Sequence, residues 1–201
     1  MPLLVNASHF WLIIMWAAYY GLHSLLAASS LKKNIQLRSP QYFPYYRITY
    51  SLFFLFTLVA ILLYQWQIDS PRLFTSNFLS FGIGIPAALV GLYIMAICIR
   101  KYFYNLSGVA AFYRKTRPES AVLELGGLHR YMRHPLYSGT LLVAWAIFLF
   151  LPFWSYLIMA ALMTLYVLIG IQLEEKKLLV EFGESYRTYR SRTAMLIPGV
   201  L

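Results

Sequence analysis

Apolar residues along this chain gather into five segments separated by polar stretches. The segments cover residues 10–28, 48–66, 78–99, 136–151 and 153–173. A helix needs about 20 residues to cross a bilayer, and about 17 to 25 are tolerated. Four segments satisfy this length, whereas the fourth is shorter and is separated from the fifth only by Pro152. The pattern predicts an all-α integral membrane bundle of five transmembrane helices, in which the last two form a hairpin that turns at Pro152.

The chain beyond residue 173 has a different pattern, because charged residues interrupt the apolar ones. Leu178, Leu179, Phe182 and Tyr186 recur at helical spacing among lysines, arginines and glutamates. This pattern predicts a C-terminal amphipathic helix over residues 173–192 that lies on the membrane or over the third loop. Gly183 is unfavourable inside a helix and predicts a break at that point.

Composition supports a membrane protein. Of the 201 residues, 60% are hydrophobic and only 12% are charged. This length predicts a single membrane domain over residues 1–201, with three spans in 1–99 and the hairpin and tail in 100–201. The single cysteine, Cys98, excludes an internal disulfide and a cysteine-based metal site, and no metal is predicted.

The net charge of +10 is interpreted through the distribution of basic residues among the loops, which indicates membrane topology and not nucleic-acid binding. The first loop is basic and includes Lys32 and Lys33. The second loop has only two charged residues, Asp69 and Arg72. The third loop and the C-terminal tail are again rich in lysine and arginine. Because basic loops stay in the cytoplasm, the N-terminus is expected outside and the C-terminus in the cytoplasm, in a bacterial inner membrane.

Two ionisable clusters flank the predicted hairpin. Arg133 and His134 precede the helix-initiating Pro135, and Glu174 and Glu175 follow the fifth apolar segment in a chain with only 7 acidic residues. These clusters are expected to meet at the cytoplasmic surface, where such groups indicate a functional site. A structural alternative exists for each cluster. The cations could anchor the helix at the lipid headgroups, and the carboxylates could form an ion pair along a helix that continues into the tail.

His23 lies within the first predicted span. A histidine inside a helix bundle commonly hydrogen-bonds a neighbouring helix. It can also bind haem or a metal ion, and the sequence leaves both interpretations open.

The hairpin region also resembles a known family. Residues 127–139 read Gly-Leu-His-Arg-Tyr-Met-Arg-His-Pro-Leu-Tyr-Ser-Gly, and Glu-Glu-Lys-Lys-Leu follows at 174–178. Phe-Gly-Glu-Ser-Tyr-Arg-Thr-Tyr occupies 182–189, before Pro198. In order and spacing these motifs resemble the isoprenylcysteine carboxyl methyltransferase and phospholipid methyltransferase superfamily. His129 departs from the pattern, because a tyrosine is usual there.

The resemblance implies a membrane methyltransferase that binds S-adenosylmethionine at the cytoplasmic end of the hairpin. It implies cofactor-binding roles for Gly127, His129, Arg133, His134, Pro135, Tyr137, Gly139, Glu174 and Glu175, and catalytic roles for Arg133, His134 and Tyr137. Residues 23–50 are similar to thiol methyltransferases of the methanethiol type. The same residues also resemble the denitrification-associated and zeta-carotene isomerase family, so a haem-dependent isomerase or accessory protein is the alternative.

The methyl acceptor is expected to be apolar. Acceptors that fit are lipophilic compounds or small thiols, carboxylates or amines that arrive from the bilayer. The pocket is expected to be lined by the second and third spans and by aromatic residues, namely Tyr46, Tyr50, Phe103, Tyr104 and Phe112.

Overall fold

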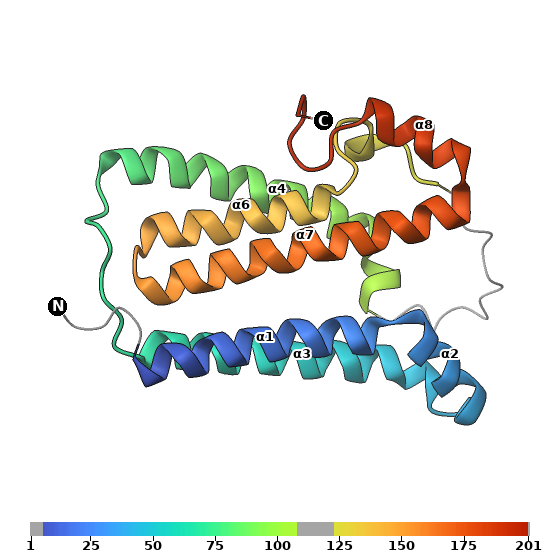
Figure 1. The fold of residues 1–201 in the computed structure, drawn as a ribbon, viewed down its shortest axis with the longest axis horizontal. Helices are drawn as coiled ribbons and strands as arrows, with labels where there is room; N and C mark the ends of the chain where they lie inside the picture. Colours follow the sequence, from blue (N-terminus) through green and yellow to red (C-terminus); the bar gives the residue numbers. More distant parts are fainter. Residues whose placement is uncertain (1–5, 108–122, 201) are drawn as a thin grey trace. The chain divides into compact units, whose positions relative to one another are not determined.

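A computed structural model describes residues 6–107 and 123–200 of the chain, and within them it contains helices and no β-strand. The chain divides into two compact units. The first comprises Met1–Phe74, Tyr102–Arg117 and Pro152–Leu162, and the second Thr75–Lys101, Pro118–Leu151 and Met163–Leu201. The helices are α1 (Ala7–Ala27), α2 (Ser29–Arg38), α3 (Phe43–Gln67), α4 (Phe78–Ser107), the 3-10 turn η1 (Gly127–Arg130), α6 (Pro135–Phe150), α7 (Trp154–Phe182) and α8 (Glu184–Arg192) (Figure 1).

The described helices confirm an all-α membrane protein. Four stretches are long and apolar enough to cross a bilayer, and they are Ala7–Ala27, Ile48–Gln67, Phe78–Lys101 and Trp154–Arg192. Helix α6 is also apolar but has only 16 residues.

In the first unit, α1 and α3 run antiparallel and tyrosine hydroxyls join them along their length. Tyr64 donates to the Ser8 carbonyl at 3.1 Å, and Tyr46 donates to the Leu26 carbonyl at 2.6 Å. Between these ends, the Trp16 indole donates to Gln65 Oε1 at 3.0 Å. Within a membrane such interhelical hydrogen bonds help to fix the pairing of apolar helices.

Ser70 joins three segments at one end of the first unit. Its Oγ lies 3.0 Å from Nε2 of His9 and accepts the Ser155 backbone N–H at 2.9 Å. The other ring nitrogen of His9 faces the Asn6 N–H within the capping box of α1. The start of α7 is therefore tied to the chain that follows α3.

In the second unit, α4 and α6 cross at two glycines. A Cβ atom added to Gly139 would lie 2.8 Å from the Gly91 carbonyl oxygen, and one added to Gly91 would lie 2.8 Å from the Gly139 carbonyl oxygen. Small residues of this kind let two membrane helices approach closely. Ile94 and Cys98 of α4 pack with Met132 in the adjoining core.

Helices α6 and α7 form the expected hairpin around Pro152 (Figure 1). Within the second unit, the Trp145 indole donates to Thr164 Oγ1 at 3.1 Å, and Arg133 before α6 pairs with Glu175 farther along α7, so the two helices run in opposite directions. The predicted start of a separate amphipathic helix at residue 173 is wrong, because α7 continues to Phe182. The break at Gly183 is confirmed, since this residue has a φ of 55° and α8 begins after it.

Candidate functional site

The turn that precedes α6 places two of the predicted site residues. Gly127 has a φ of 62°, a left-handed conformation that favours glycine, and it begins η1. His134 is the N-cap residue of α6, and Pro135 occupies the first turn of the helix, where a missing N–H costs nothing. Arg133 and His134 are therefore held at the start of a helix, next to its first N–H groups, which have no partner within the helix.

Arg133 and Glu175 form a buried ion pair in the second unit. Nε of Arg133 lies 2.8 Å from Oε1 of Glu175, and each side chain is 7% exposed. His134 Nε2 lies 3.4 Å from the same oxygen, and Arg190 Nε lies 3.2 Å from Oε2. Three nitrogen-bearing side chains thus surround one carboxylate, which compensates for its removal from water. The expectation that the two clusters meet is confirmed.

Glu174 differs from its neighbour in exposure. Its side chain is 46% exposed, and its Oε2 lies 3.7 Å from Nδ1 of His134, whose side chain is only 4% exposed. The ring of Tyr137 stacks on that of His134 with centroids 5.7 Å apart. Glu174 is therefore an accessible carboxylate beside a buried imidazole and a phenol.

The last turn of α8 and the segment after it complete the surroundings of Arg133. Nη1 of Arg133 donates to the carbonyls of Arg190, at 3.0 Å, and Thr193. Sequence reasoning did not identify the main-chain contacts of Arg190 and Thr193, because main-chain acceptors leave no side-chain signature. With Nε and Nη1 both on protein acceptors, Arg133 joins Glu175 to the end of α8 and the segment after it.

The His129 side chain forms a hydrogen bond within the turn that precedes α6. Its Nδ1 lies 3.1 Å from the Arg133 carbonyl oxygen, which only accepts, so Nδ1 carries the proton. Burial lowers the pKa of His129 below its usual value, and the imidazole is therefore neutral at pH 7. Nearby, Glu124 pairs with Lys101 at 2.9 Å, and this hydrogen bond is the main cause of the lowered pKa of Glu124.

The residues expected to line the acceptor pocket are only partly described. Tyr50 donates to the His23 carbonyl at 3.2 Å, as Tyr46 does to that of Leu26, so both hydroxyls join α3 to α1. The side chains of Phe103 and Tyr104, and Phe112 as a whole, lie outside the described residues.

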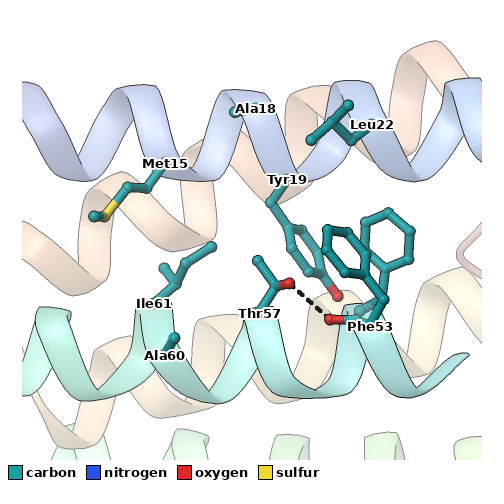
Figure 2. A pocket seen from close by; sticks show the side chains of 9 residues that line it. Met15, Ala18, Tyr19, Leu22, Phe53, Thr57, Ala60 and Ile61 are labelled. Carbon is teal, nitrogen blue, oxygen red and sulfur yellow. Dashed lines mark hydrogen bonds between the residues drawn. The ribbon is translucent and has the colours of Figure 1, made fainter. Parts of the chain in front are cut away.

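The first unit contains an apolar cavity of about 270 Å³ between α1 and α3 (Figure 2). Its lining is almost entirely hydrocarbon and aromatic, and the Thr57 hydroxyl there donates to the Phe53 carbonyl at 2.6 Å. His23 lies close by, with its ring 4.9 Å from that of Phe54 and 5.4 Å from that of Tyr50, centroid to centroid. The imidazole is therefore packed among aromatic rings.

Comparison with known proteins identifies the family. Residues 83–185 match the model of the phospholipid methyltransferase family. A methanethiol S-methyltransferase of Pseudomonas deceptionensis is 32% identical over 191 residues, which cover 89% of this chain and 68% of that protein. Proteins of the same name from Crocosphaera subtropica and Mycobacterium tuberculosis are each 29% identical, over 88% and 92% of this chain and 69% and 76% of the respective relatives.

No solved structure matches the chain. The family match includes Arg133, His134, Glu174 and Glu175 of the ionic cluster, whereas Arg190 lies beyond it. The chain belongs to the phospholipid methyltransferase family and is a membrane methyltransferase.

Proposed function

We propose that this protein transfers a methyl group from S-adenosylmethionine to a small apolar thiol at the membrane. One observation carries the assignment of the site, namely the difference between two adjacent glutamates. Glu175 is buried among Arg133, His134 and Arg190, whereas Glu174 is 46% exposed beside them. An accessible carboxylate held by a rigid neighbour is a suitable partner for a cationic cofactor.

The residues present fit the chemistry of this cofactor. S-adenosylmethionine has an ammonium group, ribose hydroxyls and a carboxylate, and it supplies an electrophilic methyl group on a sulfonium. Glu174 would bind the ammonium group or the ribose hydroxyls. The N-terminus of α6 would attract the carboxylate, because its first N–H groups carry a partial positive charge. Gly127 and Pro135 would shape the backbone around it.

Arg133 acts through Glu175 in this proposal. The family resemblance implied that Arg133 binds the cofactor, but its Nε and Nη1 are engaged by Glu175 and by two carbonyls. We assign to Arg133 the role of holding Glu175, which in turn orients His134. Gly139 has a packing role against Gly91.

His134 and Tyr137 form the wall beside Glu174. Methyl transfer from a sulfonium to a thiolate removes two opposite charges, so a site with little water favours it. The thiol must lose its proton, and the nearby acceptor is Nδ1 of His134, which lies 3.7 Å from Oε2 of Glu174. Much of the rate would come from alignment of the reacting atoms.

The acceptor is assigned from the relatives. Those compared above are named methanethiol S-methyltransferases, and a small apolar thiol agrees with the hydrophobic helices of this chain. Such a thiol partitions into the bilayer and can reach the protein laterally. The haem-dependent alternative gains no support, because the relatives are methyltransferases.

The topology remains part of the proposal. A single domain with five spans requires α6 to be the fourth crossing, and its 16 residues suffice if flanking residues reach the interfaces. The loop charges then place the N-terminus outside and the C-terminus in the cytoplasm of a bacterial inner membrane.

Calorimetry with S-adenosylhomocysteine on detergent-purified protein tests the cofactor. The wild-type protein is expected to bind it, and Glu174→Gln is expected to weaken binding at least about tenfold, as loss of a charged hydrogen bond does. Methyl-labelled cofactor with methanethiol, an amine lipid and a prenylcysteine analogue then tests the acceptor. Transfer to methanethiol supports the proposal, whereas transfer only to the lipid or the prenylcysteine analogue contradicts the thiol assignment.

A further inference from the structure

The chain after α8 pairs with the turn before α6 through its backbone. Met132 and Ala194 form an isolated parallel β-bridge. The Arg133 N–H donates to the Ala194 carbonyl at 2.8 Å, and the His134 N–H donates to the Met195 carbonyl at 3.2 Å. The main-chain N–H groups of Arg133 and His134 are thus both bound by the segment after α8. Together with the last turn of α8, this segment covers residues 189–196 and is called the strap below.

The strap also holds the Arg133 guanidinium. Its carbonyls at Arg190 and Thr193 accept hydrogen bonds from Nη1, while Nε faces Glu175. A guanidinium is planar, so acceptors on Nη1 fix the plane and therefore the direction of Nε. Arg190 adds its own Nε at 3.2 Å from the other carboxylate oxygen. The strap therefore determines which carboxylate Arg133 pairs with.

Two side-chain hydroxyls attach the ends of the strap. Tyr189 donates to the His129 carbonyl at 2.6 Å, and Ser138 donates to the Leu196 carbonyl at 2.7 Å. Between these ends, Thr193 and Ala194 are buried, at 7% and 3% exposure. The strap is therefore an ordered part of the second unit, packed against the turn.

From these contacts we infer that the strap positions the cofactor-binding carboxylate, and that Tyr189 and Ser138 are positioning residues that act through the Arg133–Glu175 pair. Glu174 and Glu175 are adjacent, so an Arg133 side chain released from the strap could pair with either one. Pairing with Glu174 would neutralise the carboxylate that the cofactor requires. The inference rests on the proposed function and adds a control of cofactor affinity by the strap.

Conservative variants test this role in the full-length protein. Tyr189→Phe and Ser138→Ala each remove one hydroxyl, and Tyr131→Phe is the matched control because its side chain is 59% exposed. Loss of one hydrogen bond corresponds to about a three- to tenfold change. We expect the Kd for S-adenosylhomocysteine and the KM for S-adenosylmethionine to rise by about that factor in each strap variant, with kcat within about twofold of wild type. Tyr131→Phe should match wild type.

A purely structural role gives a different result. Partial unfolding reduces the amount of active enzyme, so it lowers the apparent kcat and leaves KM unchanged. That pattern, or wild-type Kd and KM in both strap variants, would overturn the inference. Failure of the wild-type protein itself to bind S-adenosylhomocysteine would instead contradict the proposed function. Binding by wild type with no response in the strap variants removes only the role of the strap.

Discussion

The Arg133 guanidinium lies 2.8 Å from the Glu175 carboxylate, and both side chains are 7% exposed. Their charges are therefore largely shielded from water, and each depends on the other for compensation. Glu174, one residue earlier in α7, is 46% exposed. Two adjacent glutamates thus have different surroundings, and in the proposed function Glu175 holds the turn before α6 while Glu174 faces the cofactor.

The first prediction separates these glutamates. Glu175→Gln leaves Arg133 buried without its counter-charge and is expected to cost about 3–5 kcal/mol of stability, seen as a lower thermal midpoint in detergent. Glu174→Gln is expected to keep the wild-type midpoint, because an exposed carboxylate contributes little to folding. Equal midpoints for the two variants would contradict the assignment.

The second prediction concerns the crossing of α4 and α6. Gly139→Ala places a Cβ atom 2.8 Å from the Gly91 carbonyl oxygen, a main-chain atom that can move little. We expect a loss of about 1–3 kcal/mol, as in other overpacked interiors. Gly82→Ala in α4 is the control, since its Cβ atom would meet nothing within 4 Å. If thermal denaturation finds Gly139→Ala as stable as this control, the two helices do not cross at these glycines.

The third prediction tests topology by cysteine labelling in cells. Cys98 is first replaced by alanine, and single cysteines then replace Asp69 or Arg187, whose side chain is 71% exposed. A membrane-impermeant reagent should label the cysteine at 69 in intact cells, and the one at 187 only after permeabilisation. Labelling of both positions from the same side would contradict the five-span topology.

The fourth prediction concerns pH. Burial lowers the pKa of His129 in the folded protein. Below a pH of about 6.5 the unfolded chain therefore binds a proton at His129 more readily than the folded protein does. The stability from a neutral His129 is complete above that pH and declines as pH falls toward the lowered pKa of the folded state. Thermal midpoints measured from pH 7.5 to 5 should therefore fall more steeply for wild type than for His129→Gln. Parallel curves would show that His129 is not buried as described.

Much of the fold follows from the spacing of apolar residues. The hydrophobic segments predicted the membrane helices, and Pro152 predicted the turn between α6 and α7. An antiparallel hairpin brings the residues before its first helix close to those at a similar distance beyond the turn in its second helix. The meeting of Arg133 with the glutamate pair could therefore be predicted without any knowledge of side-chain packing.

The division of roles within the site could not be predicted from the sequence. Glu174 and Glu175 have identical chemistry, and only the direction of each side chain on α7 decides which is buried. The strap was missed for another reason. It binds Arg133 mainly through main-chain carbonyls, which every residue type possesses, so the sequence carries no sign of this contact.

The most direct test of the central claim is to measure dimethyl sulfide above purified protein supplied with methanethiol and S-adenosylmethionine. The assay compares wild type with Glu174→Gln, after both are shown to have the same thermal midpoint. We expect product that increases with time and enzyme for wild type, and at least about a tenfold lower kcat/KM for the cofactor in the variant. Absence of product from folded wild-type protein, or equal rates in the two proteins, would contradict the account.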